Sequence, residues 1–124
     1  MPETREYDVR ATTTRTFGRV LVSCRDQHLV VDGPAQNGCP GEAPTPGELF
    51  LAGVAACGVE LIDVLARERG VALADVNARI NGVMDPSKRT RQDVNLFSSV
   101  TLEFELSGVG DEDAALLVEA FKGR

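Results

Sequence analysis

One stretch of the sequence, from Thr45 to Glu60, constrains the fold more than any other, because it predicts a helix without a polar side. No residue from Leu49 to Val59 carries a charge, and small residues alternate with large ones. A helix that is apolar all round is normally buried. The run is shorter than the about 20 apolar residues that span a bilayer. The amphipathic residues that follow extend the predicted helix to Arg69, a length of about 36 Å at about 1.5 Å per residue.

Three residues encode the start of this helix. Thr45 is a typical N-cap, Pro46 suits the first helical position, and Glu48 stands three residues after the cap. This spacing predicts a capping box, in which Thr45 and Glu48 each bind a free backbone amide of the other. Gly70 is expected to follow the end of the helix, because glycine adopts the left-handed conformation easily.

The size of the chain indicates that it does not cover this helix alone. With 124 residues, 43% of them hydrophobic and 26% charged, it is expected to form one globular domain over residues 1–124. A domain this small has little material with which to surround a long apolar helix. We therefore expect an obligate homo-oligomer, in which a second copy covers the helix.

Charge and cysteine content exclude several classes of protein. The net charge of −6 argues against nucleic acid as a partner, which requires a basic patch. The charged residues 1–6 do not resemble a signal peptide, so we expect a cytoplasmic protein with reduced thiols. The spacing of Cys24, Cys39 and Cys57 predicts neither a disulfide framework nor a zinc site. No cofactor, metal or membrane partner is expected.

Alternating residues predict strands before and after the long helix. The predicted strands are residues 7–16, 19–24, 28–32, 75–83 and 96–106. The second and third form a predicted hairpin, a loop rich in Gly and Pro over 33–44 leads to the long helix, and the basic loop 85–92 is expected to be solvated. A short helix opens at Asp111 and stops at Gly123. This order predicts an α+β fold with a mostly antiparallel sheet.

The segment from Thr45 to Cys57, TPGELFLAGVAAC, resembles the helix motif of the OsmC/Ohr superfamily, the osmotically inducible and organic hydroperoxide resistance proteins. In that motif a Pro and an acidic residue begin the helix, and a reactive cysteine closes it. The leading hairpin and the turn at Gly108 into a short helix also fit, so the resemblance covers nearly the whole chain. It implies an intertwined homodimer, with the long helices packed in the middle and the sheets wrapped outside.

The resemblance also implies a chemistry. Peroxidases of the family reduce organic hydroperoxides with a cysteine thiolate, which becomes a sulfenic acid. A second cysteine then resolves the sulfenic acid as a disulfide, and a dithiol reductant restores both thiols. Cys57 matches the position of the attacking cysteine. The family's late Cys-Pro motif, which holds the resolving cysteine, is absent, and the sequence ends at Arg124, about where that motif would begin.

Each candidate catalytic residue has a second interpretation. Cys57 is either the reactive thiol or a small core residue. It lies too far along the helix for the N-terminal dipole to activate it, so a cation is needed. The family's arginine lies in the N-terminal strands, where Arg15, Arg19 and Arg25 all match, and Arg19 is our choice. The acid that orients the site in the family's hydroperoxide resistance proteins would fall at Gly47 here, and Glu48, one residue along, either orients that arginine or only caps the helix.

Three further side chains leave alternatives open. Glu60, one helical turn after Cys57, is either part of the site or paired with an arginine. Cys39 is either a substitute resolving thiol or a loop cysteine without a partner, and Cys24 is expected to be structural.

The sequence thus predicts an OsmC-like, thiol-dependent peroxidase that acts on organic hydroperoxides in oxidative stress defence. Its predicted catalytic residues are Cys57, Arg19 and Glu48, and its second substrate is a thiol reductant. The alternative is a non-enzymatic dimer of the same fold that binds a small apolar ligand at its interface.

Overall fold

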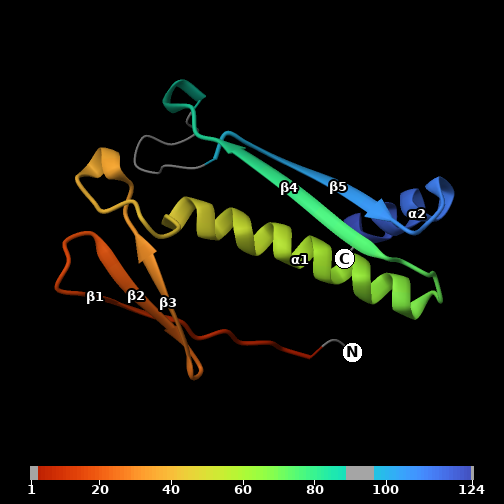
Figure 1. Cartoon of the computed structure of the whole chain (residues 1–124), viewed down its shortest axis with the longest axis horizontal. Helices are drawn as coiled ribbons and strands as arrows, with labels where there is room; N and C mark the ends of the chain where they lie inside the picture. The colour runs from red at the N-terminus through yellow and green to blue at the C-terminus, as the bar shows by residue number, and fades with distance from the viewer. Residues whose placement is uncertain (1–2, 89–96, 124) are drawn as a thin grey trace. The chain divides into compact units, whose positions relative to one another are not determined.

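The computed structural model describes residues 3–88 and 97–123 of the chain. Its main elements follow one another in the order β1, β2, β3, α1, β4, β5 and α2 (Figure 1). They group into two compact units, Met1–Phe50 and Leu51–Arg124, and α1 begins in the first unit and continues in the second. The α+β class predicted from the sequence is confirmed, with two antiparallel sheets in place of one.

The first unit is built on a three-stranded antiparallel sheet in the order β1-β2-β3. The strands are β1 (Arg10–Thr13), β2 (Arg19–Cys24) and β3 (Gln27–Asp32). The predicted hairpin is confirmed: its two-residue connection sets Cys24 opposite Gln27 and Arg19 opposite Asp32.

The first strand is shorter than predicted at both ends: it begins at Arg10 instead of residue 7, and it ends early because the chain turns immediately after Thr13. The hydroxyl oxygen of Thr14 accepts a hydrogen bond from the backbone amide of Thr16 and donates to the carbonyl of Arg19. Threonine side chains compete with strand pairing through local bonds of this kind. A run of threonines therefore predicts a strand only where the threonine hydroxyls do not form hydrogen bonds with nearby backbone groups.

The long helix α1 spans Pro46–Glu68, within one residue of its predicted end. The predicted capping box is present: the Thr45 amide donates to Glu48 Oε1 at 3.0 Å, and the Glu48 amide donates to Thr45 Oγ1 at 3.3 Å. By length and composition α1 is the one helix among the described residues that could cross a membrane. Close packing of Gly58 against Phe104 buries part of this helix within the protein.

The second unit packs α1 and α2 (Asp111–Lys122) on a two-stranded sheet of β4 (Asp75–Val83) and β5 (Ser99–Ser107). Its core is the buried cluster Ile62, Leu65, Ala66 and Leu117. Phe104 and Phe121 pack against this cluster and meet each other edge to face. A Cβ atom at Gly58 would lie 2.7 Å from Phe104 Cζ, so the helix approaches β5 as closely as a glycine permits.

One strand, β4, and both helices match their predicted limits within two residues, as does the end of β5, but the beginning of β5 does not. The prediction places it at Leu96, whereas β5 begins at Ser99. Leu96 and residues 89–92 of the predicted basic loop lie outside the described residues. Among the described residues of that loop, Pro86–Lys88 form a short 3-10 turn.

Candidate functional site

The thiol of Cys57 lies on an exposed side of α1, at the twelfth residue of the helix. A single chain thus leaves part of the apolar helix uncovered, as expected for a chain too small to surround it. Only four α1 residues are buried, namely Gly58, Ile62, Leu65 and Ala66, and they form the stripe that packs on the sheet. Cys57 immediately precedes this stripe, on a different side of the helix. Exposure makes the thiol reachable by small molecules.

Apolar and small residues lie on the N-terminal side of this thiol. On a helix the side chains three and four positions away are the nearest neighbours, which for Cys57 are Val54 and Gly53. Phe50, one turn earlier, continues the same face, with 60% of its surface exposed, and Val54 is 37% exposed. The face that presents Cys57 is therefore an exposed apolar surface, which is the property that an organic substrate or a second copy of the chain requires.

Charge near Cys57 on its own helix is negative. The sequence from Pro46 to Ala66 contains no Lys or Arg, and the nearest charged helical neighbour is Glu60. Both Cys57 and Glu60 are exposed. Any cation that activates the thiol must therefore come from another element or from a second copy of the chain.

Glu48 is held at the start of α1 by the capping box. Its carboxylate accepts hydrogen bonds from the backbone amide and the hydroxyl of Thr45, both at 3.0 Å. These bonds stabilise the charged form, so they hold the pKa of Glu48 below its usual range. Nine residues separate Glu48 from Cys57, two and a half turns of a helix. The capping role is thus confirmed, and the predicted role in catalysis stays a prediction.

Arg19 is engaged in two ion pairs within the first unit. Its Nε and Nη2 donate to the two carboxylate oxygens of Asp32 at 2.8 and 2.9 Å, and Nη2 also donates to Glu42 at 2.9 Å. Two carboxylates therefore surround one guanidinium, which leaves the cluster with a net negative charge. They raise the pKa of Arg19 above its usual value. Its predicted role beside Cys57 is not tested by this geometry.

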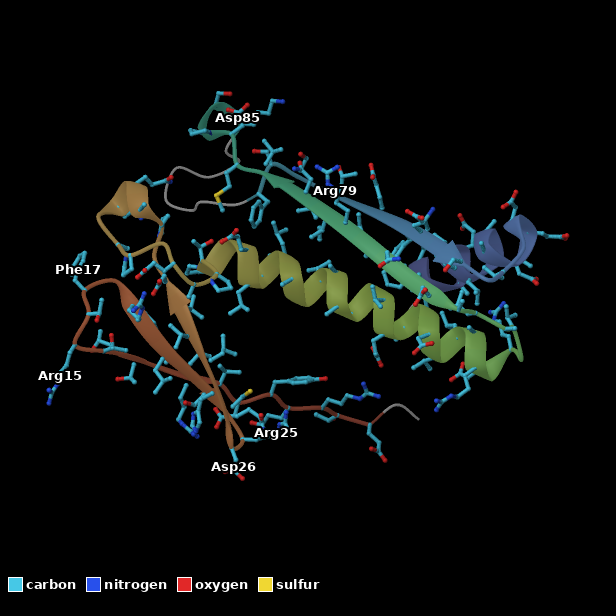
Figure 2. The ribbon with its side chains drawn as sticks, in the orientation of Figure 1. Arg15, Phe17, Arg25, Asp26, Arg79 and Asp85 are labelled. Atoms are coloured by element: carbon cyan, nitrogen blue, oxygen red, sulfur yellow. The ribbon has the colours of Figure 1, made fainter. Side chains whose placement is uncertain are left out.

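The other two candidate arginines lie in turns of the same unit. Figure 2 labels Arg15, in the turn between β1 and β2, whose side chain extends outward, and Arg25, in the β2–β3 connection. Both residues are exposed. Arg25 has a backbone φ of 52°, a left-handed conformation uncommon for a residue other than glycine. Of these three arginines, Arg19 is the half-buried one and the one that forms ion pairs.

Asp32 is the residue of this cluster that sequence reasoning missed. Its side chain is fully buried and accepts four hydrogen bonds, two from Arg19 and two from the backbone amides of Glu42 and Ala43. The Arg19 ion pair, supported by the two amides, holds the pKa of Asp32 far below its usual range, although burial opposes this. The register of the hairpin pairs residue 19 with residue 32, but the sequence predicted the hairpin without a register, so nothing in it singled out Asp32.

Cys39 occupies a notch formed by two glycines of the first unit. A Cβ atom at Gly18, whose φ is +78°, would lie 2.5 Å from the Cys39 sulfur, and a Cβ atom at Gly33 would overlap it. The thiol is half-buried. Packing of this kind gives Cys39 a structural role in closing the loop over residues 33–44.

Gly33→Ala is expected to destabilise the protein by about 1–3 kcal/mol, because the new methyl group and the Cys39 sulfur compete for the same space. Denaturant titration at constant protein concentration measures the loss. Adding Cys39→Ala, which removes the sulfur, should restore most of the stability lost in Gly33→Ala. If the effects of the two substitutions on the free energy of unfolding proved additive, the space that Cys39 occupies would not be the reason for a glycine at residue 33.

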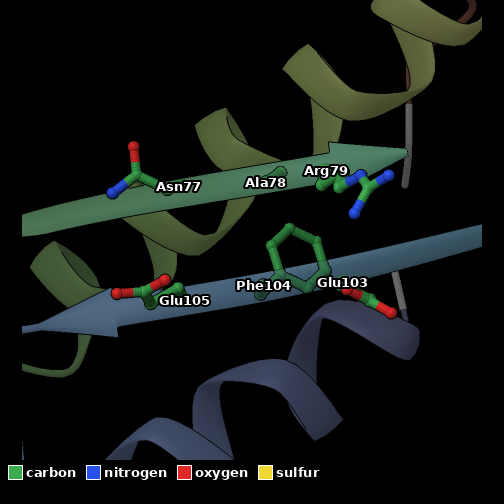
Figure 3. Close-up of a pocket in the computed structure, with 6 residues that line it drawn as sticks. All are labelled: Asn77, Ala78, Arg79, Glu103, Phe104 and Glu105. Carbon is green, nitrogen blue, oxygen red and sulfur yellow. The ribbon is translucent and has the colours of Figure 1, made fainter. Parts of the chain in front are cut away.

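The larger hollows of the second unit lie away from the thiol, on the β4–β5 sheet. One of about 270 Å³ is lined by Arg79, Asn81, Thr101 and Glu103. Figure 3 shows the neighbouring hollow, of about 280 Å³, with Arg79 and Glu103 side by side on adjacent strands. Neither contains a cysteine or histidine. Within residues 3–88 and 97–123, no group of three metal-ligating side chains occurs.

Comparison with protein families identifies the fold and the motif together. The family model described as "OsmC-like protein" matches residues 39–123, which include all of α1 and Cys57. The chain therefore belongs to the OsmC-like protein family, and the resemblance found in the sequence is confirmed. No curated protein sequence matches the chain significantly.

Solved structures of the OsmC/Ohr superfamily have the same fold. An OsmC-like protein from Mycoplasma pneumoniae is 14% identical, with a TM-score of 0.81 over 98% of this chain and 84% of that protein. An organic hydroperoxide resistance protein OsmC from Legionella pneumophila is 24% identical, with a TM-score of 0.75 over 98% and 85%. A putative organic hydroperoxide resistance protein from Vibrio cholerae is 26% identical, with a TM-score of 0.63 over 97% and 81%.

Proposed function

We propose that this protein is a thiol-dependent peroxidase that reduces organic hydroperoxides, with Cys57 as the attacking group. The observation that carries the proposal is the exposed thiol of Cys57 at the position where the family motif has its reactive cysteine. Structural relatives named as organic hydroperoxide resistance proteins support the same activity class. Oxidative stress defence in the cytoplasm is the biological role that fits this activity.

The reaction needs one sulfur and one peroxide bond. The Cys57 thiolate attacks the terminal oxygen of the hydroperoxide, an S–O bond forms and the O–O bond breaks. The sulfur loses two electrons and becomes a sulfenic acid, while the alkoxide that leaves takes a proton from water and departs as an alcohol. An external dithiol returns the sulfenic acid to the thiol, with water as the second product.

The exposed apolar face of α1 supports two parts of the proposal. Phe50 and Val54 lie within two turns of Cys57 and offer an apolar surface to the organic group of the peroxide. The same face supports a homodimer, because exposed apolar area on a helix is normally covered. Arg19 and Glu48 keep their proposed roles: Arg19 as the cation that stabilises the thiolate and the leaving oxygen, Glu48 as the acid near it.

The experiment that tests the proposal is a titration of the reduced protein with one equivalent of cumene hydroperoxide. Intact mass and a sulfenic-acid trap read the product at each cysteine. Fast and selective oxidation of Cys57 is expected, since it is the exposed thiol of the three. No reaction at Cys57 over hours, in a protein that stays folded, would contradict a peroxidase.

A second candidate function is binding of a small apolar ligand at the same face of α1. The compensation of Arg19 by Asp32 and Glu42 favours it, because a cation already offset by two carboxylates stabilises a thiolate poorly. The titration separates the two functions. A ligand-binding protein would leave its thiols reduced and would show saturable binding of an apolar fluorophore that Phe50→Ser weakens.

A further inference from the structure

Ser23 and His28 form a hydrogen-bonded pair near the tip of the β2–β3 hairpin. Ser23 Oγ lies 2.8 Å from Nδ1 of His28, the only histidine of the chain. The two residues are directly opposite each other on the two strands. When Nε2 carries the proton of the neutral imidazole, Nδ1 accepts the hydrogen bond that the serine hydroxyl donates. In this arrangement a histidine can take the proton of a serine that attacks an electrophile.

A cation lies in the same row of side chains. Arg10 on β1 is opposite Ser23, and directly opposite residues of an antiparallel sheet share one face, with Cβ atoms about 4.5–5.5 Å apart. Arg10, Ser23 and His28 therefore form a row across the three strands. Within residues 3–88 and 97–123, Arg10 forms no ion pair, so no carboxylate offsets its charge.

This row lies on the more polar of the two faces of the sheet. The opposite face carries the paired apolar residues Val20, Val22, Leu29 and Val31. An interface between copies of the chain is expected to cover that apolar face. The row is also separate from the ion pairs of Arg19, because Arg19 and Ser23 are four residues apart on β2, about 13 Å at about 3.3 Å per residue.

We infer that Ser23 is a nucleophile for activated carboxylic esters, with His28 as its general base, in an activity distinct from the proposed peroxidase. Ser23 Oγ attacks the carbonyl carbon, a C–O bond forms, and the proton of the hydroxyl passes to His28 Nδ1. Arg10 stabilises the negative charge that develops on the carbonyl oxygen. The bond to the leaving group then breaks, the departing oxygen takes the proton from His28, and Ser23 is left acylated.

The next cross-strand pair on this face favours an apolar acyl group. Leu21 is opposite Val30, and each lies two residues from a member of the Ser23–His28 pair, so all four side chains share the face. Val30 is 44% exposed. Esters of short apolar acids are therefore the substrate class that fits the site.

The experiment measures acylation of the full chain by p-nitrophenyl butyrate. Thiols react with this ester too, so neutral hydroxylamine is added afterwards, because it cleaves thioesters and leaves serine esters intact. Peptide mass mapping then gives the acylated fraction of each serine against time. Ser99 is the internal reference, since it is exposed on β5 opposite Val83, which cannot accept a proton. Ser23 is expected to react on the order of 10²-fold faster than Ser99, the lower end of the range for general-base catalysis.

His28→Gln tests the role of the base. A glutamine side chain still hydrogen-bonds to the Ser23 hydroxyl but takes up no proton near neutral pH, so acylation of Ser23 should fall to about the rate of Ser99. Arg10→Gln keeps the base and should slow acylation of Ser23 only a few-fold. Circular dichroism and an unchanged Ser99 rate show that each variant is folded and that the reagent is equally active.

Two results would overturn the inference: equal acylation rates at Ser23 and Ser99 in the wild type, or a Ser23 rate that His28→Gln leaves unchanged. Neither result involves Cys57, so the proposed peroxidase is tested separately by its own titration.

Discussion

Cys57→Ser is expected to reduce hydroperoxide consumption to the uncatalysed rate, a loss on the order of 10³-fold or more. A serine hydroxyl stays protonated near neutral pH and forms no stable oxidised product equivalent to a sulfenic acid. The exposed thiol on α1 is the group that the proposed reaction oxidises, so nothing else in the site can replace it. Residual peroxide is followed in time with dithiothreitol as the reductant.

Cys24→Ser is the control for this substitution. Cys24 is half-buried at the end of β2, and the same change of sulfur to oxygen there should leave peroxide consumption within about two-fold of the wild type. Circular dichroism and sedimentation confirm that both variants keep the fold and the oligomeric state. Equal loss in both variants, or in neither, would contradict Cys57 as the attacking thiol.

Local signals explain why so much of the fold could be predicted. The cap at Thr45, the Pro at the first helical position and the glycine at residue 70 act within one turn of the chain, so they define α1 without tertiary information. The alternation of β4 is equally local, and its predicted limits, Asp75 and Val83, are those of the strand. The predicted end of β1 was wrong because the Thr14 side chain forms hydrogen bonds to the backbone, which strand propensity does not take into account.

The candidate site could be predicted only in part, because the exposure of Cys57 and the ion pairs of Arg19 depend on tertiary contacts. The sequence indicates that α1 is apolar all round, but not that its buried stripe runs through Gly58 and leaves Cys57 exposed. Helix capping by Glu48 is local and was predicted, whereas the double ion pair of Arg19 joins residues 13 and 23 positions away. Contacts of that range need the fold before they can be named.

The second large expected effect is on stability. Asp32→Asn should lower the melting temperature by about 10 °C or more, because it breaks a buried ion pair and leaves buried donors without an acceptor. Four donors from three residues converge on the Asp32 carboxylate. An asparagine has the same shape, but it replaces one acceptor oxygen with a donor and removes the charge that Arg19 requires.

Asp26→Asn, in the exposed β2–β3 connection, is the matched control and should shift the melting temperature by no more than about 2 °C (Figure 2). Both variants are compared with the wild type at one protein concentration, because the stability of an oligomer depends on it. An equal shift for Asp26→Asn and Asp32→Asn would mean that the buried cluster around Arg19 is not what holds the first unit together.

The pH dependence of stability gives this prediction a sign that simple loss of packing does not have. The pKa of Asp32 is far lower in the folded protein than its value near 3.9 in an unfolded chain. Its contribution is therefore present in full above about pH 5 and is lost progressively as the pH falls below that value toward the lower pKa of the folded state. The lowered pKa values of Glu48 and Asp85 act in the same range in the wild type and in Asp32→Asn alike. The difference in stability between the two proteins should consequently be constant above about pH 5 and shrink on acidification. A difference that stayed constant down to about pH 2 would contradict a charged Asp32 as its source.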